Sequence, residues 1–184
     1  MDIIKYVILG IIQGLTEPLP ISSSGHLLIF RELFNTNMFN DLNFEVMVNF
    51  GSFIAILIIF WKDIVRLVTN FFKYLFADKK DKKKYYEDFK YCMLIVVGSI
   101  PVGIIGLIFK DKIEAFASVK EVGFALLITA LALFIVKNSK GKKKDNEITY
   151  KDAIIIGLFQ MCALLPGLSR SGMVLVGCLL CGLN

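Results

Sequence analysis

The sequence predicts an all-α integral membrane protein, a polytopic helical bundle. Of its 184 residues, 56% are hydrophobic, and the mean hydropathy is +0.67. Soluble domains rarely reach such values. Several apolar runs approach the roughly 20 residues that a helix needs to cross a bilayer, and lysine-rich segments separate them. We therefore treat residues 1–184 as a single membrane domain.

Three apolar runs are candidates for complete crossings: Phe44 to Trp61, Tyr91 to Phe109 and Val122 to Val136. Shorter runs, each about half a bilayer thick, meet in pairs at polar, glycine- and proline-containing tips. This pattern is typical of re-entrant broken-helix hairpins, and the sequence predicts two of them. Their half-helices are Ile3 to Ile12, Gly25 to Phe34, Ala153 to Leu165 and Met173 to Leu183.

Charged segments lie between these runs and set the expected orientation. Lys62 to Ala77 has apolar residues at helical spacing, which predicts an amphipathic surface helix, and Asp78 to Lys90 is expected to be a loop. Lysine excess places the lysine-rich loops 62–90 and 137–151 in the cytoplasm and 110–121 outside. The net charge of +5 is then an orientation signal, and we expect no nucleic-acid partner.

An internal repeat relates the two hairpins. Aligning Ser22 with Ser169 also aligns Gln13 with Gln160 and Gly25 with Gly172. Because the charges place the two copies on opposite sides of the membrane, the repeat has inverted topology, and we expect the two broken hairpins to meet near the midplane. The first repeat is 1–136, namely the hairpin 1–34 and three transmembrane helices. The second starts at 149–184, and its remainder is missing.

The first tip, Gln13 to His26, carries polar groups that lipid cannot accommodate, so it must be buried in protein or line a cavity. Glu17 can exchange a proton or bind a cation. Ser22, Ser23 and Ser24 precede a half-helix, so we expect at least one to cap it and another to face substrate. His26, the chain's single histidine, lies beside these hydroxyls and is expected to be functional.

The second tip carries Arg170, whose guanidinium suits a carboxylate or a phosphate. Neighbouring backbone N–H groups at a helix start would complete an anion site. A structural ion pair between Arg170 and Glu17 is the alternative. Acid, hydroxyl, imidazole and arginine together suit phosphoryl transfer. The expected anion-binding neighbours are Gly167, Ser169, Ser171 and Gly172.

The four cysteines lie in or beside apolar runs. Cys178 and Cys181 form a CxxC, but no second pair or nearby histidine completes a metal site, so we expect ordinary helix packing. The N-terminus lacks a basic region and a cleavage site, and is not expected to be a signal peptide. We expect no organic cofactor.

The two tips resemble the signatures of the bacterial undecaprenyl-diphosphatase family of the bacitracin-resistance type. The first signature is Gln13 to His26, the second is Pro166 to Gly172, and the likeness extends over the whole chain. The resemblance implies hydrolysis of undecaprenyl diphosphate to the monophosphate carrier lipid of peptidoglycan synthesis, with bacitracin resistance. It also implies a bacterial plasma-membrane location, a polyprenyl diphosphate substrate and a divalent cation, Mg²⁺ or Ca²⁺. A homodimer is left open.

The resemblance further implies roles for individual residues. Gln13 and Glu17 would form the acidic-motif pair, with any metal at Glu17. Ser23 would be the nucleophile or a phosphate contact, unless water attacks. His26 would be the acid/base partner, and Arg170 would bind the diphosphate.

Three departures from the family pattern stand out. Gln13 replaces the glutamate of many members, and Val174 replaces a threonine. The chain also stops at Asn184, whereas family members continue for roughly a third more. We therefore expect a C-terminally truncated chain, a fragment or a shortened reading frame, without the counterparts of Phe44 to Val136.

Two further functional classes are open. Inverted repeats with broken helices are the usual architecture of secondary transporters, so a transporter or flippase for an anionic lipid or solute is the alternative. The cluster of Glu17, Ser23 and His26 favours the enzyme, because an anion carrier needs no acid/base set. A structural subunit would leave the buried ionisable groups without a use.

Overall fold

A computed structural model describes residues 2–33, 42–115 and 118–183, and its named elements are helices. Some residues of the predicted elements lie outside these ranges, including Phe34 at the end of the first hairpin. The elements are α1 (Asp2–Thr16), α2 (Ser23–Leu33), α3 (Leu42–Ile59), α4 (Trp61–Phe76), α5 (Lys82–Ile108), α6 (Lys110–Ala115), α7 (Val119–Val136), the 3₁₀ turn η2 (Asp145–Glu147), α8 (Tyr150–Cys162) and α9 (Arg170–Leu180).

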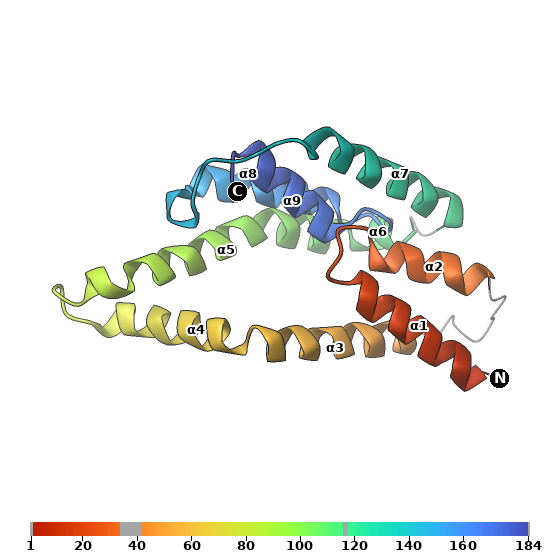
Figure 1. Ribbon diagram of the computed structural model, residues 1–184, viewed down its shortest axis with the longest axis horizontal. Coiled ribbons are helices and arrows are strands. Elements are labelled where there is room, and N and C mark those ends of the chain that lie inside the picture. The colour runs from red at the N-terminus through yellow and green to blue at the C-terminus, as the bar shows by residue number, and fades with distance from the viewer. Residues whose placement is uncertain (1, 34–41, 116–117, 184) are drawn as a thin grey trace.

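The helices pack as an elongated layered bundle (Figure 1). Helices α3 and α4 follow one another along one edge, and α5 returns beside α4. The α8–α9 hairpin lies between α5 and α7, while the α1–α2 hairpin packs on α3 and α7. Both predicted hairpins therefore exist as helix–turn–helix units, and both contact α7.

Two helices, α5 and α7, are long and apolar enough to cross a membrane. The α3–α4 pair adds a third candidate if it is one span, although its axis bends by 74° at Phe60. No proline or glycine marks this bend in the sequence. Large apolar side chains are exposed along many helices, as expected for helices that face lipid.

Two expected loops are partly helical. Asp78 to Lys90 is not a loop throughout, because α5 begins at Lys82 and extends the apolar span by charged turns. The 110–121 segment likewise contains α6 and the start of α7. Ser118 and Glu121 form a capping box there, and this serine–glutamate spacing is visible in the sequence.

Close backbone approach holds the α8–α9 hairpin against α5. A methyl group at Gly157 would overlap the Gly98 carbonyl, so α5 and α8 touch through two glycines. Such small-residue contacts are the usual way for membrane helices to pack, because lipid removes the hydrophobic driving force. A buried cluster of Ala125, Ala163, Leu168 and Met173 joins the same hairpin to α7.

Candidate functional site

The break of the first hairpin is shaped by Ser22. This residue is buried and has a left-handed backbone, φ 64°. Its Oγ accepts the Gly25 N–H at 3.4 Å and so caps α2, as expected for one of the three serines. Its carbonyl accepts from the His26 Nδ1, 2.8 Å away. Because a carbonyl only accepts, Nδ1 carries the proton and Nε2 is the nitrogen left for proton transfer.

Glu17, just before this break, is the centre of a hydrogen-bond cluster. Its Oε2 accepts from Ser23 Oγ at 2.5 Å and from Gln13 Nε2 at 2.8 Å. Gln13 Nε2 also donates to Asn49 Oδ1 at 2.7 Å, which ties the first hairpin to α3. The cluster fixes the Ser23 hydroxyl directly against a carboxylate, the geometry that a general base needs.

The break of the second hairpin orients α9. Gly167 has φ 93°, and a Cβ there would lie 2.7 Å from the Val122 carbonyl, so only glycine fits. Ser169 is the N-cap of α9, accepting the Gly172 N–H at 3.1 Å. Its own N–H donates to Thr129 Oγ1 of α7 at 3.2 Å. These bonds leave the N–H groups of Arg170 and Ser171 unpaired at the helix start, where an anion binds well.

The two tips touch one another. Ser171 Oγ donates to the Leu19 carbonyl at 3.2 Å, across 152 residues of sequence. A Cβ at Gly172 would lie 3.0 Å from the Pro20 carbonyl. The sequence expectation that the two tips meet is therefore correct for the described residues.

A cavity of about 620 Å³ lies between the hairpins and α3. Glu17 and Ser23 line it from the first hairpin and Arg170 lines it from the second, so it holds a carboxylate, hydroxyls and a guanidinium at once. Its described lining is Glu17, Leu19, Ser22, Ser23, Ser24, Asn49, Ser52, Phe53, Ile56, Gln160, Ala163, Leu168, Ser169, Arg170, Ser171 and Val174.

Not every predicted residue lines this cavity. Gln13 and His26 do not line it: Gln13 contacts Glu17, and His26 contacts Ser22. Gly167 and Gly172 shape the second turn. Glu17 and Arg170 make no ion pair, which excludes the structural pairing as an account of these two charges in this geometry. The Arg170 side chain is thus exposed to the cavity without a carboxylate partner.

Asn49 and Ser52 are polar lining residues that the sequence did not single out. Asn49 lies on α3, an apolar helix without a polar motif, and it both lines the cavity and accepts from Gln13. The one signal in the sequence was an amide inside a candidate membrane span. Gln160 was noted only as a repeat match, and it also lines the cavity.

A buried oxygen atom of Gln13 bears on the expected cation. Gln13 is 2% exposed, and its Oε1 has no hydrogen-bond partner. An amide oxygen and a carboxylate are donors that Mg²⁺ and Ca²⁺ prefer, so the two residues fit such an ion in chemical type. The Gln13 amide presents its Nε2 to Glu17, so it would have to turn for its Oε1 to share an ion with the carboxylate. Within 2–33, 42–115 and 118–183, no group of three or more His, Cys, Asp or Glu side chains could hold a metal. Substrate phosphates and water would have to complete the coordination.

The base of the second hairpin is fixed by a partly buried ion pair outside the candidate membrane spans. Lys143 Nζ lies 2.9 Å from Asp152 Oδ1, and Asp152 also accepts from the N–H and hydroxyl of Thr149. Burial opposes ionisation of this carboxyl, but the Lys143 and Thr149 hydrogen bonds and the Lys143 charge outweigh it and lower its pKa to about 2.

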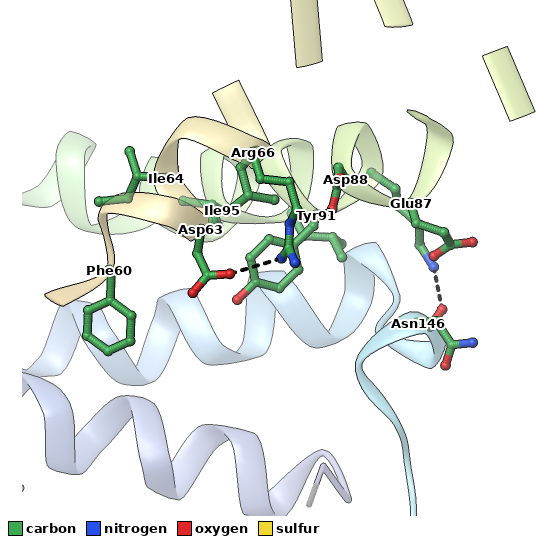
Figure 2. Close-up of a pocket in the computed structure, with 12 residues that line it drawn as sticks. Phe60, Asp63, Ile64, Arg66, Glu87, Asp88, Tyr91, Ile95 and Asn146 are labelled. Carbon is green, nitrogen blue, oxygen red and sulfur yellow. Dashed lines mark hydrogen bonds and ion pairs between the residues drawn. The ribbon is translucent and has the colours of Figure 1, made fainter. Parts of the chain in front are cut away.

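A second cavity, of about 580 Å³, lies between α4 and α5 (Figure 2). Arg66 lies 3.4 Å from Asp63 and 3.9 Å from Asp88 in its wall, and Glu87 adds another carboxylate. Its cations are therefore offset by carboxylates, whereas Arg170 is not. The hairpin cavity is the better place for a phosphate.

The model of the family described as "Bacitracin resistance protein BacA" matches residues 6–184. Similar curated proteins include undecaprenyl-diphosphatase 2 of Bacillus thuringiensis and undecaprenyl-diphosphatase of Oceanobacillus iheyensis, each 46% identical over 99% of this chain. Undecaprenyl-diphosphatase of Acholeplasma laidlawii is 43% identical over 96% of it. The chain spans 66%, 66% and 65% of these three relatives, respectively.

Proposed function

We propose that this chain, which belongs to the BacA family of bacitracin resistance proteins, hydrolyses undecaprenyl diphosphate to undecaprenyl phosphate and inorganic phosphate. A nucleophile adds to the terminal phosphorus, the phosphoanhydride bond breaks, and the bridging oxygen leaves with the lipid monophosphate. Water supplies the oxygen that ends on the released phosphate. The lipid monophosphate would return to cell-wall synthesis, which accounts for bacitracin resistance.

The observation that carries this proposal is the cavity that Ser23 and Arg170 enter from different hairpins. Arg170 and the unpaired N–H groups at the start of α9 would hold the diphosphate. Ser23 would attack the phosphorus or position the attacking water. Its proton would pass to Glu17, whose carboxylate already accepts the Ser23 hydroxyl.

The remaining predicted residues support these groups. His26 holds the Ser22 turn through Nδ1, and Nε2 stays available as the acid/base partner. Ser24 is exposed in the cavity and would contact substrate oxygens, as would Ser171. Ser22, Ser169, Gly167 and Gly172 would act through the backbone shape of the two turns.

A divalent cation would be held by Glu17 and by Gln13, once the Gln13 amide has turned its free oxygen toward the carboxylate. When bound, it would neutralise charge on the two phosphates. Because Gln13 brings no charge, this chain would bind the cation more weakly than a protein with two carboxylates there.

The fold would sit in the bacterial plasma membrane as an inverted repeat with two re-entrant hairpins. The lysine-rich segments 62–90 and 137–151 would face the cytoplasm. The likeness of the two helix–turn–helix units and their contact at Leu19 and Ser171 support this arrangement. A homodimer is compatible with it.

The test is phosphate release from undecaprenyl diphosphate by the purified chain in detergent. We expect Ser23→Ala and Arg170→Ala each to reduce kcat/KM by about a hundredfold or more. Ser99→Ala and Arg66→Ala are matched controls outside the cavity, and should stay within about twofold. Undiminished release by both site variants would overturn the proposal. Transport of the lipid without release would favour the carrier.

A further inference from the structure

A third cavity, of about 430 Å³, adjoins the candidate site between α1 and α3. These helices lie side by side (Figure 1). Glu17, Ser52 and Ile56 line both this cavity and the polar one, so the two adjoin at these residues. Away from these shared residues the two linings differ. The polar cavity has hydroxyls and charged groups, whereas the third cavity is lined mainly by glycine and apolar side chains.

Glycines make this groove wide. Gly10 and Gly14 lie on α1, and Gly51 faces them from α3. A Cβ on Gly14 or Gly51 would meet no atom within 4 Å, and one on Gly10 would meet only Val48, at 3.9 Å. The absence of side chains therefore leaves open space along the groove. Packing does not require glycine at these positions, in contrast to Gly157 and Gly167.

The rest of the groove wall is apolar. Val48, Ala55 and Ile59 of α3 form it, with Phe60 at its far end. The Ser52 hydroxyl donates to the Val48 carbonyl and is already satisfied. Apart from Glu17 at the junction, the described wall offers no charged group, so its occupant should be an apolar chain without hydrogen-bonding groups.

We propose that this groove, lined by Gly10, Gly14, Gly51 and α3, seats the first isoprene units of the polyprenyl tail while the diphosphate occupies the polar cavity. This inference rests on the proposed function. A molecule that fills both cavities would carry a charged head joined directly to an apolar chain, because Glu17 borders both. Because the chains of membrane lipids are as apolar as the groove, the groove would select the polyprenyl tail by its shape and not by the hydrophobic effect.

Leucine at Gly14 or Gly51 tests the groove, because a Cβ at either position meets no atom within 4 Å and the longer side chain would reduce the open space. Phosphate release is compared for undecaprenyl diphosphate and for a diphosphate with a single isoprene unit, whose tail ends near the junction. For the long substrate we expect KM, as a mole fraction of the detergent micelle, to rise about tenfold in either variant. For the short one we expect less than a twofold change. Gly103→Leu and Gly123→Leu are matched controls, since a Cβ there also meets nothing within 4 Å.

Each outcome of this comparison supports or contradicts the assignment of the groove to the polyprenyl tail. Unchanged KM for both substrates, or equal losses on both at a native unfolding temperature, would overturn the tail assignment. Thermal stabilisation by undecaprenyl diphosphate gives a readout without turnover. If the wild-type chain is stabilised but releases no phosphate, the proposed reaction fails. The assignment of the groove to the polyprenyl tail then holds only if Gly14→Leu and Gly51→Leu reduce that thermal stabilisation while Gly103→Leu does not.

Discussion

Ser171, in the first turn of α9, donates a hydrogen bond to the carbonyl of Leu19, in the break between α1 and α2. This bond joins the tips of two hairpins that lie at opposite ends of the sequence. Beside it, Glu17 and Ser23 enter the same cavity as Arg170. The site therefore depends on how closely the two tips approach, and its acid/base groups and its phosphate-binding group come from different hairpins.

Gly172 sets that approach. A Cβ there would lie 3.0 Å from the Pro20 carbonyl and 3.0 Å from Ser169 Cβ. We expect Gly172→Val to push the tips apart and lower kcat/KM for phosphate release by about tenfold or more, since small displacements of catalytic groups are costly. Gly123→Val on α7 is the control, because that position is open. Equal activity of the two variants would show that the tips tolerate separation.

Gln13→Glu should strengthen binding of a divalent cation. The new carboxylate would lie beside Glu17, whose Oε2 is now 2.8 Å from Gln13 Nε2, so two like charges would face each other without a cation. We expect Mg²⁺ or Ca²⁺ to raise the unfolding temperature of this variant at roughly tenfold lower concentration than for the wild type. Identical titration curves would argue against a cation at these residues.

Asp152 should make stability depend on acid pH. Its folded-state pKa, about 2, lies below the ordinary value of 3.8, so the stabilisation is complete above about pH 4 and is lost as the pH falls toward 2. Lys143 is 39% exposed, and solvent screening reduces the effect to about 1 kcal/mol. Chemical unfolding in detergent at pH 6 and near pH 2 measures it.

Asp152→Asn should lose the stabilisation by the Lys143–Asp152 pair at pH 6, and the stability of this variant should depend less on pH than that of the wild type. Asp81→Asn is a suitable control, because the Asp81 side chain makes no capping hydrogen bond at the start of α5. If the two variants share one stability profile, the Lys143–Asp152 pair contributes nothing measurable.

Much of the candidate site could be predicted from the sequence, because a polar side chain at membrane depth is costly unless it lines a cavity or contacts another polar group. Glu17, the three serines and Arg170 were all identified by polarity within apolar runs, and the repeat predicted that their hairpins meet. The family comparison confirms the family that the two tips resemble. The individual catalytic roles stay predictions.

Other features required the three-dimensional arrangement. Asn49 joins the site through a contact with Gln13 that no periodicity in α3 reveals. The bend at Phe60 has no proline or glycine signal. Helix α5 begins in a lysine-rich stretch because charged residues propagate a helix in water as well as apolar ones do in lipid. His26 was expected to be functional, as the acid/base partner in the family resemblance. In the structure its Nδ1 donates to the Ser22 carbonyl, and it does not line the cavity.

The most direct test is a double-mutant cycle between Ser23 and Arg170, measured as kcat/KM for phosphate release from undecaprenyl diphosphate. If the two hairpins form one active site, Ser23→Ala and Arg170→Ala each remove most of the activity. The double variant should then be no more than about threefold worse than the poorer single variant. Losses that multiply in the double variant would contradict a single site shared by the two hairpins.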